Sequence, residues 1–548
     1  DTAGTGNISL LSGIVQVDDL LSALSVVYPT ETNTAVYGPL RNIDSDTWNA
    51  WVTYVGKYGG YGLELATQGI SGPSAKYYYG CNVVAGRSTV CDTVGNDTVW
   101  PVTEGGDAGG YVGLMRSGVI TNGQSYDMKE IRAMRSAGGY AGSMQTGGVA
   151  ELGQAGIELF GLNLQANLGK LVSALGEVFV PSIHSGSVRG WQSGLTVTAD
   201  GIDRDPGSDG LYDTNQDITY RCGYAGGYVG SAYGAQILGD QNVGDEEGTG
   251  CNVVNLRYVR GNNAAGGYAG IATAASMAEV NTHASQKGLL EGVLESAVQN
   301  NDDLASVLQA TVTKIKQAQV DPDSSDFGFV VEGVNDTPPR YAGGFAGQLE
   351  ASFVGVDIGD VTDELDENAA IETNIVVNGL RSVNAIYDGG GFFGLADVTG
   401  VANVSGSENT NVLGSTLSIG EISVIDAFRS YVYFSEVNGV EEGIIVRVHN
   451  ESSEATLGET RVSGCAGGFG GAMMNGTVKY SKVTNLSTVY GKNYSGGFIG
   501  HMGKSGVVDA DNASVASLVG LTAGVFDVFS THTDRCEVDG IADGAVIM

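Results

Sequence analysis

A hexapeptide of the form small-Gly-Gly-aromatic-x-Gly recurs eight times, and it constrains the fold more than any other feature of the chain. The first copy runs from Ala108 to Gly113 and the last from Ser495 to Gly500. The six copies between them begin at Ala137, Ala225, Ala265, Ala342, Gly389 and Ala466. A short glycine-rich unit that recurs along a chain is typical of one structural unit stacked on copies of itself. The repeat therefore predicts a fold that grows along one axis.

The fourth position of the hexapeptide is always a six-membered aromatic ring. It is Tyr111, Tyr140, Tyr228 and Tyr268 in the first four copies and Phe345, Phe392, Phe469 and Phe498 in the last four. Tyr and Phe replace one another where a ring packs and its hydroxyl is optional, so we expect each ring to point inward and stack on the ring of the next coil. The two preceding glycines let neighbouring backbones approach closely.

Short strands surround the hexapeptides. Apolar and polar residues alternate at 251–256 and 478–483, and β-branched residues follow small turn residues, as in Gly506-Val507-Val508. Two neighbouring copies, at Gly109 and Gly138, lie 29 residues apart, which we take as the length of one coil. These patterns predict an all-β chain that forms a parallel β-helix, or β-solenoid, of Gly-Gly-aromatic-x-Gly repeats with insertions in the longer gaps.

The spacing of the motifs also suggests how the chain is divided. Residues 1–103 lack a full hexapeptide and are expected to form an N-terminal capping section, because the end of a solenoid must be covered. Repeats fill residues 104–512. Two insertions, near 160–180 and 284–318, show the spacing of apolar residues that predicts helices. Residues 513–548 are either a C-terminal cap or the start of a following segment.

Charge and hydropathy narrow the function classes. The formal net charge is −35 and the pI is about 4.2, which disfavours binding to nucleic acid or to anionic membranes. No run of eighteen apolar residues occurs, so we expect no membrane insertion. The chain begins at Asp1 without an initiator Met, as a processed secreted protein or a section of a longer one would.

The six cysteines fall into three pairs along the chain. These are Cys81 with Cys91, Cys222 with Cys251, and Cys465 with Cys536. An even number without zinc-site spacing favours disulfides and an extracellular setting. Reduced, buried cysteines are the alternative, and the pairing itself does not follow from the sequence.

One acidic segment has the beginning of a calcium loop. Asp213, Asn215 and Asp217 place oxygen ligands at alternate positions, but Ile218 and Tyr224 stand where such a loop needs Gly and Glu. We therefore name these three residues as a Ca²⁺ candidate beside the alternative of an ordinary acidic turn. No other cofactor is expected.

No catalytic site emerges from the sequence. The five histidines are scattered, no G-x-S-x-G motif occurs, and no Lys-Ser or Lys-Thr follows a glycine-rich copy as in a phosphate loop. Asp509 and Asp511 form a pair of the kind that sugar-cleaving β-helix enzymes use as acid and base, which keeps an enzyme open as an alternative.

The hexapeptide, followed by a small turn and a Val-rich strand, resembles the GLUG-type Gly-rich repeats of large surface proteins from Gram-positive, often gut-dwelling, bacteria. The similarity covers about residues 104–508 and is closest at 476–500. It implies a secreted or cell-wall-attached β-solenoid used for adhesion, display or assembly.

The function expected from these features is that of a non-enzymatic extracellular or cell-surface structural protein, an adhesin-like stalk or a self-assembling filament subunit. Its partner would be a host or cell-surface protein or glycan, or another copy of itself. The alternatives are a polysaccharide-degrading β-helix enzyme, either a glycoside hydrolase or a polysaccharide lyase, and a carbohydrate-binding module.

Overall fold

A computed structural model describes the protein with side chains over most of the repeats. The described ranges are 106–116, 118–145, 180–201, 223–239, 250–274, 312–322, 327–333, 339–357, 374–397, 429–449, 463–474, 476–503 and 531–548. The other strands named below are described by their backbone.

Four large sheets contain most of the strands. Two of them flank the hexapeptides and have eight strands each. The upstream hexapeptide sheet consists of β7 (Asp107–Gly109), β11 (Ser136–Gly138), β18 (Tyr224–Gly226), β22 (Ala264–Gly266), β27 (Tyr341–Gly343), β31 (Asp388–Gly390), β40 (Cys465–Gly467) and β44 (Tyr494–Gly496). The downstream hexapeptide sheet consists of β8 (Val112–Met115), β12 (Ala141–Gln145), β19 (Val229–Tyr233), β23 (Ala269–Thr273), β28 (Ala346–Glu350), β32 (Phe393–Asp397), β41 (Gly470–Met474) and β45 (Ile499–Gly503).

The other two large sheets complete the circuit. The nine-stranded sheet consists of β1 (Thr30–Thr32), β9 (Val119–Thr121), β13 (Ser182–His184), β20 (Gln236–Leu238), β24 (Thr313–Lys316), β29 (Ser352–Val354), β35 (Tyr431–Tyr433), β42 (Thr477–Lys479) and β46 (His532–Asp534). The fifteen-stranded sheet consists of β2 (Ala35–Tyr37), β3 (Glu64–Leu65), β4 (Cys81–Val84), β10 (Gln124–Ala133), β14 (Ser187–Gly190), β15 (Leu195–Ala199), β21 (Cys251–Gly261), β25 (Ala318–Pro322), β26 (Phe329–Gly333), β30 (Ile375–Ala385), β36 (Ser435–Gly439), β37 (Ile444–Val448), β43 (Lys482–Tyr490), β47 (Glu537–Gly540) and β48 (Val546–Ile547).

Four small antiparallel pairs lie outside the large sheets. They are β5 (Asp92–Val94) with β6 (Asp97–Val99), β16 (Asp203–Arg204) with β17 (Thr219–Tyr220), β33 (Ser418–Ile419) with β34 (Ile422–Ser423), and β38 (Ser453–Thr456) with β39 (Glu459–Val462).

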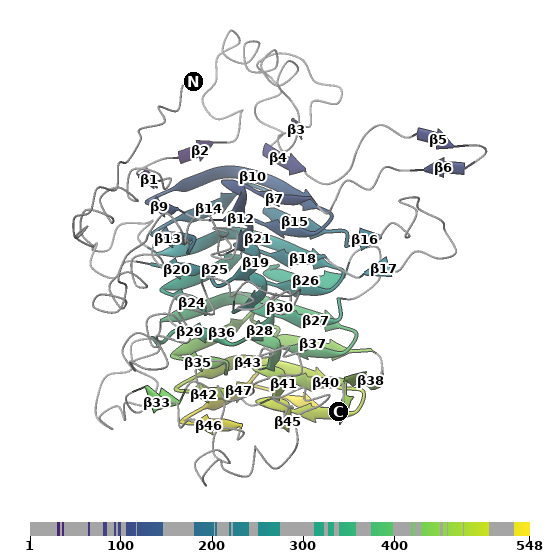
Figure 1. The fold of residues 1–548 in the computed structure, drawn as a ribbon. Coiled ribbons are helices and arrows are strands. Elements are labelled where there is room, and N and C mark those ends of the chain that lie inside the picture. Colours follow the sequence, from purple (N-terminus) through teal and green to yellow (C-terminus); the bar gives the residue numbers. More distant parts are fainter. Residues whose placement is uncertain are drawn as a thin grey trace, which may run out of the picture.

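The chain passes through the four large sheets in turn and then repeats the circuit (Figure 1). We call one circuit a coil and number the coils 1 to 8 by their hexapeptides. Coil 2, for example, contains β11, β12, β13, β14 and β15, and each of these strands pairs in parallel with its equivalents in the neighbouring coils. The described chain is therefore all-β, with parallel sheets of many strands in the arrangement of a β-solenoid.

The paired glycines of the hexapeptide are needed because the next coil lies directly against them. A Cβ added to Gly344 would lie 2.0 Å from the carbonyl oxygen of Gly391, and one added to Gly391 would lie 2.0 Å from that of Gly468. Only a residue without a side chain allows this approach. In the last coil, a Cβ added to the equivalent residue, Gly497, would have none of the described residues within 4 Å.

The eight hexapeptide rings form one continuous column through the interior. Neighbouring rings are 4.6–4.9 Å apart between centroids, and their planes lie within 13° of each other. The six inner rings are fully buried, whereas Tyr111 and Phe498 at the two ends are partly buried. The inward, stacked placement expected from the hexapeptide is what the structure shows, and the column is about 34 Å long.

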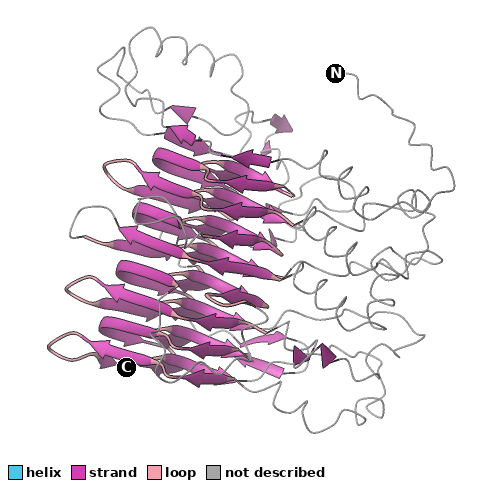
Figure 2. Ribbon diagram, turned by 90° about the vertical axis from the view of Figure 1, so that its left-hand side faces the viewer, coloured by secondary structure: helices cyan, strands magenta, loops and turns pink. Residues whose placement is uncertain are grey.

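The coils are of two alternating kinds. In coils 1, 3, 5 and 7 the fifteen-stranded sheet receives one long strand that contains a residue at positive φ, as at Asn255 (63°) and Gly379 (65°). In coils 2, 4, 6 and 8 it receives two shorter strands joined by a connection, and Figure 2 shows loops projecting at alternate levels on one side of the molecule. The structural period is therefore two coils.

The connections in coils 2, 6 and 8 share one turn geometry. In coil 2 the N–H of Gly194 donates to the carbonyl of Trp191 (2.8 Å), and in coil 6 the N–H of Gly443 donates to the carbonyl of Val440 (2.9 Å). Both glycines have φ near 90°, a backbone conformation that favours glycine. Gly544 closes the same turn in coil 8.

Both ends of the chain contribute to the stack. At the N-terminal end β1 pairs with β9, and β2 and β4 pair with β10, so parts of the section before the first hexapeptide extend two sheets by one row. At the C-terminal end β46, β47 and β48 pair with coil 7 and complete coil 8. The boundary expected at residue 512 therefore does not end the repeats, since 532–547 belong to the last coil.

The expected helices meet the described residues only at the end of the second insertion, and there the prediction is wrong. β24 and β25 occupy Thr313–Lys316 and Ala318–Pro322. Thr313 and Ile315 are buried while Lys314 and Lys316 are partly exposed, which is the period of a strand. The rest of the span 284–318, and 160–179, lie outside the described residues.

Candidate functional site

Among the described residues, a hollowed surface lies where the two hexapeptide sheets meet, and we call it the outer bend. Side chains at the first position of each upstream strand face those at the third and fifth positions of the downstream strands. The hydrogen bond between Ser136 Oγ on β11 and Ser231 Oγ on β19 (3.0 Å) shows that the two rows touch across the bend. Functional groups from successive coils are thereby brought into one line.

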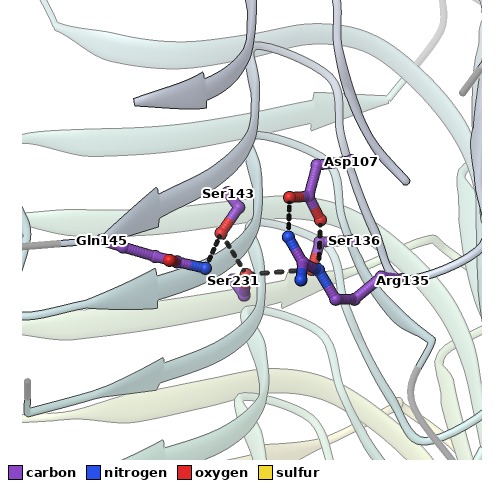
Figure 3. Close-up of polar contacts among 6 residues, drawn as sticks. All are labelled: Asp107, Arg135, Ser136, Ser143, Gln145 and Ser231. Atoms are coloured by element: carbon purple, nitrogen blue, oxygen red, sulfur yellow. Dashed lines mark hydrogen bonds and ion pairs between the residues drawn. The ribbon is translucent and has the colours of Figure 1, made fainter. Parts of the chain in front are cut away.

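At the N-terminal end, polar groups fill the outer bend and bond to one another (Figure 3). Arg135 forms an ion pair and a hydrogen bond (2.9 Å) with Asp107, whose side chain is only 4% exposed. Ser231 also bonds to Ser143 Oγ (3.0 Å), which in turn accepts from Gln145 Nε2 (3.0 Å). This part of the bend is therefore closed by its own side chains.

Towards the C-terminal end, apolar side chains fill the bend. Leu395, Cys465, Ala472 and Met474 pack in one buried cluster. Beside them the carboxylate of Asp388 is fully buried and accepts the N–H of Cys465 (3.3 Å).

Between these two stretches, the outer bend contains a hollow of about 440 Å³ across coils 3 to 5. Its lining is aromatic and polar and consists of Tyr224, Tyr233, Asn263, Ile271, Thr273, Ala274, Arg340, Tyr341, Gln348 and Glu350. It is the candidate functional site, because binding sites are concave and combine aromatic faces with a few placed polar groups.

The hollow exists because coil 4 carries small side chains between larger ones. Along the upstream sheet, Ala264 of coil 4 pairs in register with Tyr224 of coil 3 and with Tyr341 of coil 5. Along the downstream sheet, Thr273 of coil 4 stands between Tyr233 and Glu350 in the same way. Of these two small residues, Thr273 lines the hollow, whereas Ala264 is fully buried in a cluster with Tyr341.

Hydrogen bonds hold the polar groups of the hollow in place. Asn263 Nδ2 donates to Tyr224 Oη (3.2 Å), and Thr273 Oγ1 donates to Glu350 Oε2 (3.4 Å). Gln348 donates to the other oxygen of the Glu350 carboxylate. Asn263 is 9% exposed, and its Oδ1 accepts no hydrogen bond from the described residues.

Burial keeps the hydroxyl of Tyr233 protonated, so that it can donate a hydrogen bond. Burial raises the pKa of Tyr233, with a smaller contribution from nearby Tyr224 and Glu350. The hydroxyl therefore stays protonated at neutral pH. Glu350 is the one carboxylate among the lining residues, whereas hydrolysis of a glycosidic bond uses a pair, so the hollow is better suited to binding than to cleavage.

The aromatic residues singled out from the sequence lie elsewhere. The hexapeptide rings line the interior, so the column supports the fold and the inner rings are not exposed to a ligand. The Ca²⁺ candidates Asp213, Asn215 and Asp217 lie outside the described residues, as does the pair Asp509 and Asp511. Within the described part of the chain, no three His, Cys, Asp or Glu side chains are grouped as metal ligands.

The expected disulfides are not found among the described cysteines, which are free thiols. Cys465 begins β40 in the outer bend, whereas Cys536 lies before β47 with its Sγ directed at the carbonyl of Val478 (3.6 Å). The two residues therefore belong to different faces of the solenoid. Cys251 is buried in the core, and burial raises the pKa of its thiol. The side chains of Cys81, Cys91 and Cys222 are outside the described set.

The tyrosines of the hollow were not identified from the sequence. Tyr224 and Tyr341 each stand immediately before the first residue of a hexapeptide, and Tyr233 lies three residues after one ends. Aligning the eight copies position by position would have shown that coil 4 has Ala and Thr where its neighbours have larger residues.

The described residues include no helix long and apolar enough to span a membrane. Comparison with protein-family models, curated proteins and solved structures finds no match to the chain.

Proposed function

We propose that the chain is a non-enzymatic structural β-solenoid of the GLUG-type repeat class that acts outside the cell or at its surface, as an adhesin-like stalk or a self-assembling filament subunit. The observation that carries the proposal is the unbroken column of eight rings, with all four sheets in register around it. A body built in this way is stiff along one axis and presents its side chains and loops along its flanks.

The C-terminal end of the column supports assembly with another copy. Large hydrophobic side chains that are exposed in the described part of the chain lie in the end coils. They are Leu114 in coil 1 and Tyr490, Tyr494, Met502, Val546, Ile547 and Met548 in coils 7 and 8. The strands of coil 8 are also edge strands, whose backbone groups can pair with a further coil.

Gly497 gives a direct test of this assembly. A Cβ added to its equivalents in coils 1 to 7 would clash with a carbonyl oxygen of the next coil, whereas one added to Gly497 would meet none of the described residues within 4 Å. A methyl group there would leave the monomer intact and clash with any coil stacked on it. We therefore expect purified protein to form end-to-end oligomers by sedimentation and electron microscopy, and Gly497→Ala to abolish them.

A surface change away from the ends serves as the control. Gln192→Ala alters an exposed turn in coil 2 and is expected to leave the oligomers unchanged. A protein that stays monomeric at every concentration would refute the filament form of the proposal. Antibody labelling of intact source cells tests the surface location, and failure to label them would refute the stalk form as well.

The extracellular location no longer draws support from disulfides in the described repeats, because Cys251, Cys465 and Cys536 are free thiols. It rests on the resemblance of the hexapeptides to those of surface proteins. The enzyme alternative is tested separately, by incubation with pectin, alginate and host glycans. Reproducible product release that is lost in Asp511→Asn would replace the structural role with a catalytic one.

A further inference from the structure

We infer that the hollow across coils 3 to 5 of the outer bend is a binding site for a short, neutral saccharide. The first reason is the pairing of aromatic rings with fixed polar groups. Tyr224 and Tyr233 are partly exposed and line the space from the two opposing sheets. A tyrosine ring offers an apolar face to the C–H surface of a sugar and a hydroxyl to its edge.

The second reason is that the polar groups are already positioned. Glu350 is held by Thr273 and Gln348, and Asn263 is held by Tyr224. Groups that are fixed before binding lose little conformational entropy when a ligand arrives. Together they offer both donors and acceptors, which suits a ligand with many hydroxyl groups.

Charge favours a neutral sugar over an acidic one. The lining holds one cation, Arg340, and one anion, Glu350. No cationic excess is present in the hollow to attract a carboxylate-bearing or sulfated sugar, and the chain as a whole carries a net charge of −35, which repels polyanions.

The backbone around the hollow disfavours a peptide ligand. A peptide that binds to a sheet usually adds a strand to a free edge. The walls here are inner strands, β22 and β23 among them, which pair with neighbours on both sides. Only side chains are left to recognise the ligand.

The size of the hollow fits a segment of a chain of sugars rather than a large globular partner. It extends along the solenoid axis over three coils and ends at coil 2, where Ser136 and Ser143 bond to Ser231 and close the outer bend. The inference goes beyond the proposed structural role, because it applies to a monomer as well as to a filament.

The test is titration calorimetry of the purified chain with neutral tetrasaccharides of glucose, N-acetylglucosamine, mannose and galactose, with polygalacturonate as the acidic comparison. We expect at least one neutral saccharide to bind saturably with a Kd in the range of about 10 μM to 1 mM, which corresponds to roughly −7 to −4 kcal/mol. Tyr224→Ala and Tyr233→Ala are each expected to weaken that binding about fivefold to tenfold, by loss of a ring face.

Tyr258→Ala is the matched control, because Tyr258 is a partly exposed tyrosine on β21 in the fifteen-stranded sheet, outside the hollow. It should leave the affinity unchanged. Thr273→Tyr, which fills the gap in coil 4, should block binding while both ring faces remain. Circular dichroism and thermal unfolding establish that each variant is folded.

Three results would overturn the inference. They are no saturable binding of any neutral saccharide, binding of polygalacturonate alone, and equal affinity losses for Tyr258→Ala and the hollow variants. Because sedimentation reports assembly and calorimetry reports binding, the failure of this inference and the failure of the filament proposal are distinguishable.

Discussion

Two stacked tyrosines in the ring column provide a sharp test of how the core is stabilised. Tyr228 and Tyr268 are neighbours with centroids 4.8 Å apart, and both are fully buried. Tyr228 Oη donates a hydrogen bond to the carbonyl of Gly186 (2.9 Å), whereas Tyr268 Oη has no hydrogen-bond partner among the residues that the structure describes. The same change, Tyr to Phe, therefore removes a bonded hydroxyl at one site and an unbonded hydroxyl at the other.

The expected effects have opposite signs. A buried hydrogen bond contributes about 0.5–1.5 kcal/mol net, so Tyr228→Phe should lower the free energy of unfolding by about 1 kcal/mol. A buried hydroxyl without a partner costs about 1–3 kcal/mol, so Tyr268→Phe should raise the free energy of unfolding by about 1 kcal/mol once the small void is included. The two variants should thus differ by roughly 2 kcal/mol.

Urea unfolding followed by circular dichroism measures this difference through the midpoints, provided that the slopes stay equal. Phe345 and Phe392 already occupy the same position in later coils, so the Phe ring itself is compatible with the column. If Tyr268→Phe proved as destabilising as Tyr228→Phe, the reasoning would be refuted, because the hydroxyl of Tyr268 would then have to be bonded in the folded protein.

Other predictions follow from the glycines, the tyrosine pKa values and the thiols. Gly391→Ala should destabilise the fold by about 3 kcal/mol or more, whereas Gly497→Ala should stay within about 1 kcal/mol of the parent, as read from thermal unfolding. Burial raises the pKa of Tyr268 above its ordinary value of 10.0. The unfolded chain therefore loses this proton first, and the free energy of unfolding, unaffected below about pH 10, falls as the pH rises further. Tyr268→Phe should therefore reduce the alkaline fall in unfolding free energy by about 1.4 kcal/mol per pH unit, measured by urea unfolding between about pH 10 and 12. Cys465 and Cys536 should both be alkylated by iodoacetamide in urea without reductant, and peptide mass spectrometry that finds either one unmodified would contradict the free thiols.

The sequence predicted the ring column because its signal is local. Each copy of the hexapeptide contains both the glycines and the aromatic residue, and the exchange of Tyr268 for Phe345 in the next copy already indicated a buried ring. The strands followed from alternation within a few residues, as in 251–256.

The hollow could not be predicted in this way, because it depends on residues from different coils. Tyr224, Ala264 and Tyr341 are far apart in the chain and become neighbours only through the register of the upstream sheet. The mistaken helix at 313–318 has a related cause. Val312 and Ile315 lie three residues apart, as on one face of a helix, whereas the strand buries Thr313 and Ile315, two residues apart.

Odd coils give the fifteen-stranded sheet one long strand with a residue at positive φ, which we call a bent strand, and even coils give it two short strands. Two coils, rather than one, are therefore the unit by which the protein can be lengthened or shortened. Gly109, Gly226 and Gly343, which are the second residues of the hexapeptides in coils 1, 3 and 5, are spaced by 117 residues each time. Removing or duplicating a segment of that length would keep each turn above a bent strand. Removing a single coil would instead place two bent strands, or two pairs of short strands, next to each other in the fifteen-stranded sheet. Gene rearrangements and engineered variants that preserve the stack should therefore change its length in pairs of coils.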